Sequence, residues 1–149
     1  MATLTTTLTE NLNLNNSLRG STNSVTTENI NDVFERIVTC TASVVTTVAV
    51  FDTLPSTSAG AIDVDRTKYI RVTNLEAEVD IELAVVTTNT NYQVTLTAGQ
   101  SHILCSGSAV ALGEVDTTPS FGAMENITSL QVQPTTAVTA RVEVFVGVE

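Results

Sequence analysis

The sequence is poor in the residues that usually carry catalysis or nucleic-acid recognition. Among 149 residues there is no Trp, aromatic residues make up 4%, His102 and Lys68 are the only residues of their kind, and six Lys+Arg stand against sixteen Asp+Glu. Binding a phosphate backbone requires clustered Lys or Arg, and a net charge of -10 repels nucleic acid and anionic membranes. We therefore exclude direct contact with nucleic acid. The scarcity of aromatics also argues against the lined cleft in which a glycosidase holds sugar.

Long apolar runs are absent as well. No stretch of about 18 apolar residues occurs, so no segment is expected to span a bilayer. The opening residues, MATLTTTLTENLNLNNS, lack the basic region and the continuous apolar region of a secretory signal. We expect a protein that is made in the cytoplasm and does not enter a membrane. Under that expectation the glycosylation sequons at Asn15 and Asn126 carry no meaning.

The few candidate catalytic and metal-binding residues do not form a recognised site. Cys40 falls on the apolar parity of its run and Cys105 ends another, so we expect two buried, reduced thiols, with a disulfide as the alternative. A serine triad would have to use His102, but no GxSxG elbow is present. A zinc site would combine His102 with both cysteines at no recognised spacing. We expect no enzyme, no cofactor and no metal, and assign His102 to the surface or rim.

Threonine and valine, in contrast, are abundant. This β-branched composition favours strands over helices, and a core without Trp must be built from Val, Ile, Leu and Ala. The length suits one domain with a proper core. The predicted fold is all-β, a single antiparallel β-sandwich of about eight or nine strands and jelly-roll-like. Residues 1–25 are expected to form an extended arm and residues 26–149 the sandwich.

Alternation of apolar and polar residues marks the expected strands. The most regular run spans residues 137–148, with one apolar parity at Val138, Ala140, Val142, Val144, Val146 and Val148. Residues 36–52 are expected to form one long strand, or two joined near Thr46-Thr47, with Val38, Cys40, Ala42, Val44, Val48 and Val50 buried. Further strands are expected over residues 69–73, 75–83, 94–96, 101–105 and 129–133, and one short strand at 109–112 inside a long loop over 107–126.

Residues 27–37 allow two interpretations. Ile30, Val33, Phe34 and Ile37 have helical spacing, and Thr27 is a plausible N-cap. The alternation of Val33, Glu35 and Ile37 indicates a strand that begins early instead. Both remain open at this point.

A stripe of carboxylates is the clearest polar feature. It lies on the run over 75–83, where Glu76, Glu78, Asp80 and Glu82 alternate with Leu75, Ala77, Val79, Ile81 and Leu83. Alternate residues on a strand lie about 6.5 to 7 Å apart, whereas calcium takes about six to eight oxygens at about 2.3 to 2.6 Å. A bare strand cannot wrap an ion, so we expect a solvated face that guards an edge against aggregation. The pair Asp63 and Asp65 raises the same calcium hypothesis and receives the same interpretation.

The Thr- and Asn-rich arm over residues 1–25 carries a leucine pattern. Its leucines are spaced mostly by even steps, which would place them on one side of an extended strand: Leu4, Leu8, Leu12, Leu14 and Leu18. The arm has too little apolar surface to fold alone. We expect it either to add an edge strand to its own sheet or to lie on a neighbouring subunit.

Five short segments carry a family resemblance. They are the LTE.LNLN arm and residues 18–24, 30–38, 68–75 and 96–101. Through these segments, the sequence resembles over most of its length small virion structural proteins of tailed bacteriophages, particularly those of marine and cyanobacterial hosts. The resemblance implies a β-sandwich that decorates or cements the capsid surface, bound to the major capsid protein and to itself as a homo-oligomer such as a trimer. The alternatives are a neck, tail or fibre protein of the virion and, from another class, a carbohydrate- or host-binding module. The resemblance assigns no site residues.

Overall fold

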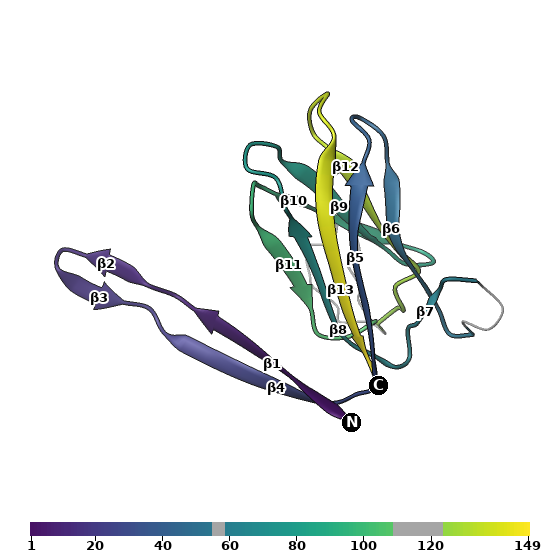
Figure 1. Ribbon diagram of the computed structural model, residues 1–149, viewed down its shortest axis with the longest axis horizontal. Coiled ribbons are helices and arrows are strands. Elements are labelled where there is room, and N and C mark those ends of the chain that lie inside the picture. The colour runs from purple at the N-terminus through teal and green to yellow at the C-terminus, as the bar shows by residue number, and fades with distance from the viewer. Residues whose placement is uncertain (55–58, 109–123) are drawn as a thin grey trace, which may run out of the picture.

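The chain folds into a β-sandwich from which a long β-hairpin extends (Figure 1). The computed structural model describes residues 1–54, 59–108 and 124–149. Within these ranges it contains thirteen strands and no helix. A five-stranded sheet of order β10-β9-β12-β6-β7 packs against a four-stranded sheet of order β11-β8-β13-β5. All pairings are antiparallel except β6 with β7, so the predicted all-β sandwich is confirmed.

The strands of the five-stranded sheet are β10 (Asn91–Leu96), β9 (Ile81–Val86), β12 (Ser129–Pro134), β6 (Thr46–Asp52) and β7 (Ile62–Asp63). Those of the four-stranded sheet are β11 (Ser101–Leu104), β8 (Thr67–Asn74), β13 (Ala140–Val148) and β5 (Asp32–Cys40). The hairpin consists of β1 (Ala2–Thr9), β2 (Leu12–Leu14), β3 (Ser17–Arg19) and β4 (Thr22–Ile30). The short strand expected at 109–112 lies outside the described residues.

An aliphatic core fills the space between the two sheets. Central strand β13 contributes one parity of fully buried residues, as its alternation predicted: Ala140, Val142, Val144 and Val146. Opposite them, the five-stranded sheet contributes Ile81, Leu83, Val85, Leu130 and Val132, which are also 0% exposed. Burying each large aliphatic side chain contributes about 1.5 to 3 kcal/mol, so this core is the main source of stability. Val138 lies before the strand and is exposed.

The expected long strand over 36–52 is two strands in different sheets. β5 ends at Cys40 and β6 begins at Thr46, so the chain breaks over residues 41–45 and not at Thr46-Thr47. A bulge in the pairing of β6 with β12 then shifts the register, and Val48 and Ala49 are both buried. Beyond the bulge Phe51 is buried and Val50 is exposed. The predicted burial of Val44 and Val50 is therefore wrong.

The helix considered for residues 27–37 does not form. Residues up to Ile30 belong to β4, and β5 begins at Asp32 and pairs with β13 along its whole length. Asn29 has a φ of 63°, outside the right-handed helical region, and lies within β4 where the register with β1 shifts. Nine residues of pairing with a central strand outweigh the weak helical spacing. The strand alternative is confirmed.

The prediction of a strand over residues 75–83 is also wrong for the first half of this run. β8 ends at Asn74 and β9 begins at Ile81, and residues 75–80 carry the chain from one sheet to the other. The buried side chain of Asn74 organises this crossing: its Nδ2 donates to Val79 O at 2.7 Å and its Oδ1 accepts from Glu76 N at 3.1 Å. The four carboxylates therefore do not share one strand face.

Candidate interaction surface

The hairpin of residues 1–30 is the most unusual surface of the protein. β1 pairs with β4, and β2 pairs with β3 around Asn15 and Asn16, whose positive φ values of 52° and 63° are those of a two-residue type I′ turn. The pairing keeps one register through the interruption near Gly20. Gly20 has a φ of 111°, and a Cβ there would lie 2.1 Å from Glu10 O, so this position requires glycine.

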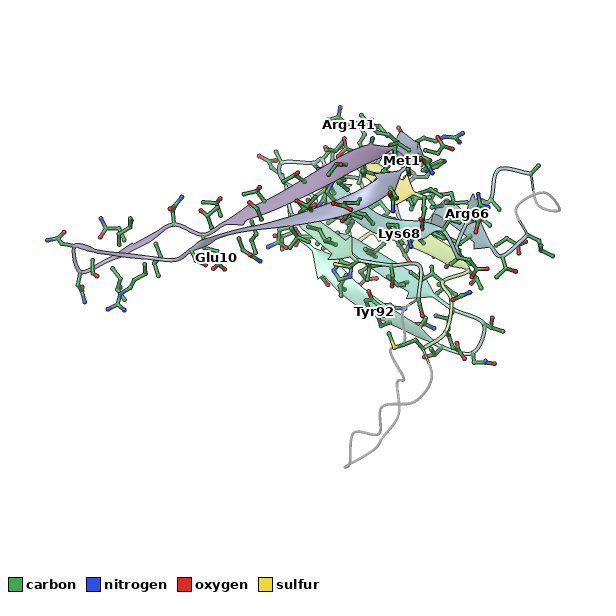
Figure 2. The ribbon with its side chains drawn as sticks, turned by 90° about the horizontal axis from the view of Figure 1, so that it is seen from below. Met1, Glu10, Arg66, Lys68, Tyr92 and Arg141 are labelled. Carbon is green, nitrogen blue, oxygen red and sulfur yellow. The ribbon has the colours of Figure 1, made fainter. Side chains whose placement is uncertain are left out.

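Among the residues that the structure describes, no third strand pairs with this hairpin. The β1-β4 and β2-β3 ladders are separate two-stranded sheets, and neither sandwich sheet includes them. The expectation that the arm adds an edge strand to its own sheet is therefore wrong. Figure 2 shows the ribbon from about Glu10 outward clear of the sandwich. A two-stranded ribbon is only marginally stable in water, so the hairpin has the form of an element that awaits a partner.

The two faces of the hairpin differ in chemistry. Alternation along paired strands puts Leu4, Thr6 and Leu8 on one face with Val25, which pairs with Thr6. The opposite face carries hydroxyls, and Thr7 Oγ1 lies 2.9 Å from Ser24 Oγ there. Leu18, 77% exposed, pairs with Asn13 and so lies on the other face from Leu12 and Leu14. The large apolar side chains of the first face are strongly exposed: Leu8 61%, Leu12 55%, Leu14 54% and Val25 56%. Grouped exposed apolar side chains mark interaction sites, and we call this group the leucine strip.

The base of the hairpin rests on the outer face of the four-stranded sheet. There Leu4 and Thr6 are half-buried, and Tyr69 is buried. The Tyr69 and Phe145 rings meet edge to face with centres 6.0 Å apart, and the Arg71 guanidinium carbon lies 5.6 Å from the centre of the Phe145 ring. Beyond the base the hairpin leaves the sheet, and a groove of about 350 Å³ opens, lined by Leu4, Thr5, Thr6, Thr7, Tyr69, Arg71, Ser101, Ile103 and Phe145.

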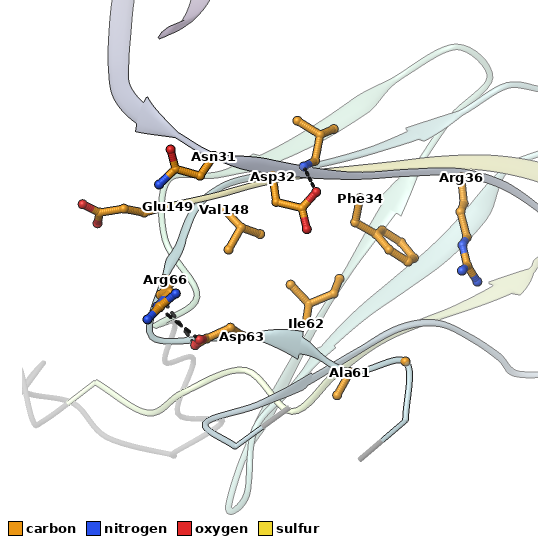
Figure 3. Close-up of a pocket in the computed structure, with 12 residues that line it drawn as sticks. Asn31, Asp32, Phe34, Arg36, Ala61, Ile62, Asp63, Arg66, Val148 and Glu149 are labelled. Atoms are coloured by element: carbon orange, nitrogen blue, oxygen red, sulfur yellow. Dashed lines mark hydrogen bonds and ion pairs between the residues drawn. The ribbon is translucent and has the colours of Figure 1, made fainter. Parts of the chain in front are cut away.

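A second groove, of about 550 Å³, opens between β5 and β7 beside the C-terminus (Figure 3). Phe34, Ile62 and Val148 form its apolar floor. At the rim Asp63 Oδ2 lies 3.5 Å from Arg66 Nε. The Oδ1 atom of Asp63 accepts the backbone N–H of Asp65 at 3.1 Å, so this carboxylate holds a turn together. This arrangement is an opening at a sheet edge that is lined by three acidic and two basic side chains.

The acidic residues singled out as calcium candidates make separate side-chain contacts. Asp65 Oδ1 accepts a hydrogen bond from Asn126 Nδ2 at 3.3 Å, whereas Asp63 pairs with Arg66. Glu76 Oε1 accepts from Arg141 Nε at 3.0 Å and from its backbone N at 2.9 Å, which lowers the pKa of Glu76. Glu82 is exposed on β9. Among the residues that the structure describes, no group of three or more His, Cys, Asp or Glu could hold a metal ion.

His102 lies at the rim of the sandwich and makes a structural contact. Its Nε2 is 2.9 Å from the hydroxyl of Tyr92, and the two rings meet edge to face at 5.8 Å. His102 is on β11 and Tyr92 on β10, the edge strands of the two sheets, so the pair joins the sheets at one side. Burial lowers the pKa of His102 and raises the pKa of Tyr92.

This pair predicts a pH dependence of stability. Because the folded-state pKa of His102 lies below the ordinary 6.5, the unfolded chain binds the proton more readily. Stability is then full above about pH 6.5 and falls as the pH drops below it. Because Gln cannot titrate, we expect His102→Gln to reduce the fall of the urea midpoint between about pH 6.5 and 5. Equal slopes in the wild type and the variant would contradict this role. The lowered pKa values of Glu76, Glu125 and Glu149 act only below their ordinary 4.5.

The two cysteines differ. Both are free thiols, so the disulfide alternative is wrong. Cys40 is fully buried, as predicted, and burial raises the pKa of its thiol. Cys105 is exposed, against the prediction, because β11 ends at Leu104 and Cys105 begins the following turn.

Sequence reasoning found the leucines of the arm and missed its second strand. The signal was present: Asn15-Asn16 between the LNL and SLR segments is a turn pair that tolerates positive φ. The Thr-rich stretch that follows, which is now β4, pairs with β1 up to Ile30. The hairpin therefore extends past residue 25, where the arm was expected to end.

Comparison with protein-family models, with curated proteins and with solved structures found no match to this chain. Within the described part of the chain, no helix is long and apolar enough to cross a bilayer. Of the features that the structure describes, the hairpin is the one whose form points most clearly to a function.

Proposed function

We propose that this chain is a non-catalytic structural protein of a virion, which decorates and cements the capsid surface of a tailed bacteriophage by binding the major capsid protein and further copies of itself. It is made in the host cytoplasm. The single observation that supports this most is the hairpin, whose leucine strip extends into solvent away from a closed sandwich core. An element of this form gains stability only by contact with another surface.

The distribution of charge supports the same role. Residues 1–30 hold Arg19, Glu10 and Glu28, a net charge of -1, so the rest of the chain carries -9 of the total -10. The acidic body keeps free copies soluble and away from packaged DNA. The nearly neutral hairpin is the part of the molecule that approaches a partner with the least repulsion.

The leucine strip can supply the binding energy. Complete burial of a Leu side chain contributes about 1.5 to 3 kcal/mol, and the distal leucines are more than half exposed before contact. Covering each of these leucines therefore contributes about 1 kcal/mol or more to the binding free energy, before the entropy lost on association is subtracted. The chain's high local copy number on a particle would add avidity.

A neck, tail or fibre position within the virion is the second candidate, because the same hairpin serves there equally. The two positions differ in copy number, since a decoration protein follows the whole capsid lattice and a neck or tail protein is confined to one place.

Substitution of the leucine strip tests the proposed function. We expect a triple variant of the full chain to bind particles with a dissociation constant raised about tenfold or more, as measured by co-sedimentation, which corresponds to about 1.4 kcal/mol. The variant carries Leu8→Ser, Leu12→Ser and Leu14→Ser. The sandwich should keep its circular dichroism and its urea midpoint, because none of these side chains lies in its core. The matched control makes three substitutions on the opposite face that keep each hydroxyl and remove only a methyl group: Thr7→Ser, Thr9→Ser and Thr22→Ser. Undiminished binding by the leucine variant would refute the role of the hairpin.

A further inference from the structure

We propose that two copies of this chain pair through the open edge of β1, with the two β1 strands antiparallel and centred on Thr6. The inference rests on the proposed function in treating the hairpin as an assembly element. It adds the identity of one partner, a second copy of the same hairpin, and the register of the contact.

The edge of β1 is open and unprotected. β1 pairs with β4 on one side, and within residues 1–54, 59–108 and 124–149 this sheet has no other strand. Proteins usually guard an exposed edge strand with charge, proline or a bulge along it. β1 reads ATLTTTLT, eight residues with neither charge nor proline, and its one irregularity lies at the first residues, between Ala2 and Leu4. From Leu4 to Thr9 the edge is therefore a regular template for another strand.

The backbone groups that face the open edge can be assigned. Glu10 N donates to Ser21 O at 2.9 Å, so the groups of Glu10 point toward β4 and its continuation. Alternate residues of an antiparallel strand direct their N–H and C=O to opposite sides. The register of β1 with β4 is unbroken from Leu4 to Thr9, so the free groups belong to Thr5, Thr7 and Thr9.

The sequence of β1 is symmetric about its centre. Residues 3–9 read TLTTTLT, the same in both directions, with Thr6 in the middle. An isologous contact places the same patch of both subunits against itself around a twofold axis. Two antiparallel β1 strands centred on Thr6 would set Leu4 opposite Leu8 of the second copy, and Thr5 opposite Thr7 of the second copy. The Thr5 and Thr7 positions are those with free backbone groups, so the hydrogen-bond pattern and the sequence symmetry agree.

The second strand has a place to lie. The groove of about 350 Å³ runs along Leu4 to Thr7, and β4 contributes no residue to it. Its far wall includes Ile103, which is 43% exposed on the outer face of β11. A strand added to β1 would cover this side chain. The product is a four-stranded sheet of order β4-β1-β1-β4, which exceeds the three strands that give a sheet independent stability.

The pairing also extends the leucine strip. Leu4 and Leu8 of both copies would lie on one face of the joined sheet, at about 4.5 to 5.5 Å between opposed Cβ atoms. The two acidic bodies are attached at opposite ends of the joined strands, which limits their repulsion. A twofold pair of hairpins would therefore place the exposed Leu8 of each copy next to the half-buried Leu4 of the other.

Charge reversal at the axis tests this register. Thr6 is the only residue of β1 that would lie opposite itself, so Thr6→Lys and Thr6→Glu each set two like charges directly across from one another, which is destabilising. By sedimentation equilibrium in low salt, we expect the wild type to have twice the chain mass and each variant to dissociate with a constant raised about tenfold or more. Mixing the two variants should restore the dimer, less so in high salt. Thr26→Lys and Thr26→Glu, on exposed β4 positions away from the axis, are the matched controls and should dimerise as the wild type does.

A cysteine at the axis gives an independent measurement. The directly opposed pair at Thr6 would be a non-hydrogen-bonded pair with Cα atoms about 4.5 Å apart, within the range for a disulfide. In a Cys105→Ser background, Thr6→Cys should therefore oxidise to a covalent dimer, and Thr26→Cys should not. This variant carries no charge and keeps the strand intact, so it remains informative if the charged variants fold poorly.

A wild type that is monomeric up to its highest soluble concentration would overturn the inference. So would a dimer that is indifferent to charge at Thr6, a mixture of variants that stays dissociated, or no disulfide at position 6. All these measurements are made without particles. A lost dimer with intact particle binding therefore refutes only the twofold pairing, whereas an intact dimer with no particle binding refutes the proposed function.

Discussion

Replacement of Asn74 by Leu should lower the free energy of unfolding by about 3 kcal/mol, because it removes a buried side chain that donates to the carbonyls of Val79 and Leu96 and accepts from the N–H of Glu76. Asn74 is 0% exposed at the end of β8. Its Nδ2 donates to Val79 O at 2.7 Å, to Leu96 O at 3.1 Å and to Thr97 O at 3.2 Å. One side chain thus joins the crossing loop to the end of β10.

Urea denaturation of Asn74→Leu beside Asn91→Leu measures this effect. Asn91 is exposed at the start of β10, so its replacement is expected to change stability by less than about 0.5 kcal/mol. If Asn74→Leu were as stable as Asn91→Leu, the loop over residues 75–80 would not depend on this side chain. The crossing between the sheets would then need another explanation.

Leu130→Ala is expected to destabilise the sandwich by about 2 to 5 kcal/mol, the range for deleting a large buried aliphatic side chain. Leu130 lies on β12, a central strand that pairs with β9 on one side and β6 on the other, and it is 0% exposed. A cavity there is surrounded by paired strands, which cannot collapse around it. The cost should therefore fall in the upper part of the range.

Val50→Ala is the matched control for Leu130→Ala. Val50 is on β6 opposite Ser129, and its side chain is 42% exposed. We expect its loss to cost less than about 1 kcal/mol. Equal urea midpoints for the two variants would mean that the core does not lie between these sheets as described.

The class of fold and the central strand could be predicted because alternation reports burial directly. In β13 every second residue from Ala140 to Val146 is 0% exposed, and the sequence has Val or Ala at each of these positions. β13 pairs with β5 in one unbroken register over its whole length, so its parity does not change along that pairing. Its pattern in the sequence is therefore the pattern in the fold.

Alternation failed where the chain left a sheet or bulged. The run over 75–83 alternates without interruption, yet its first half crosses between sheets, because Asn74 offers the local backbone hydrogen bonds that compete with a ladder. The bulge in β6 reversed the parity at Val50 and Phe51. Both effects depend on pairing with distant segments, which a single strand's sequence does not contain.

The candidate interaction surface was predictable in part. The spacing of Leu4, Leu8 and Leu12 indicated an apolar side of an extended arm, and these residues do belong to the hairpin. The pairing of β1 with β4 was not predicted, since Thr-rich strands without strong alternation specify register weakly. The role of the arm toward other chains is a property of an assembly, and a lone sequence carries only the chemistry of its surface.

The most direct test of the account is the copy number and position of this chain in purified virions, measured by quantitative mass spectrometry and by cryo-electron microscopy. The proposed function predicts copies in proportion to the major capsid protein, distributed over the outer capsid surface, with the leucine strip of residues 8–14 in contact with a neighbouring chain. A few copies at the neck or tail would contradict capsid decoration. Absence from the particle, or a hairpin that points freely into solvent in every bound copy, would contradict the account as a whole.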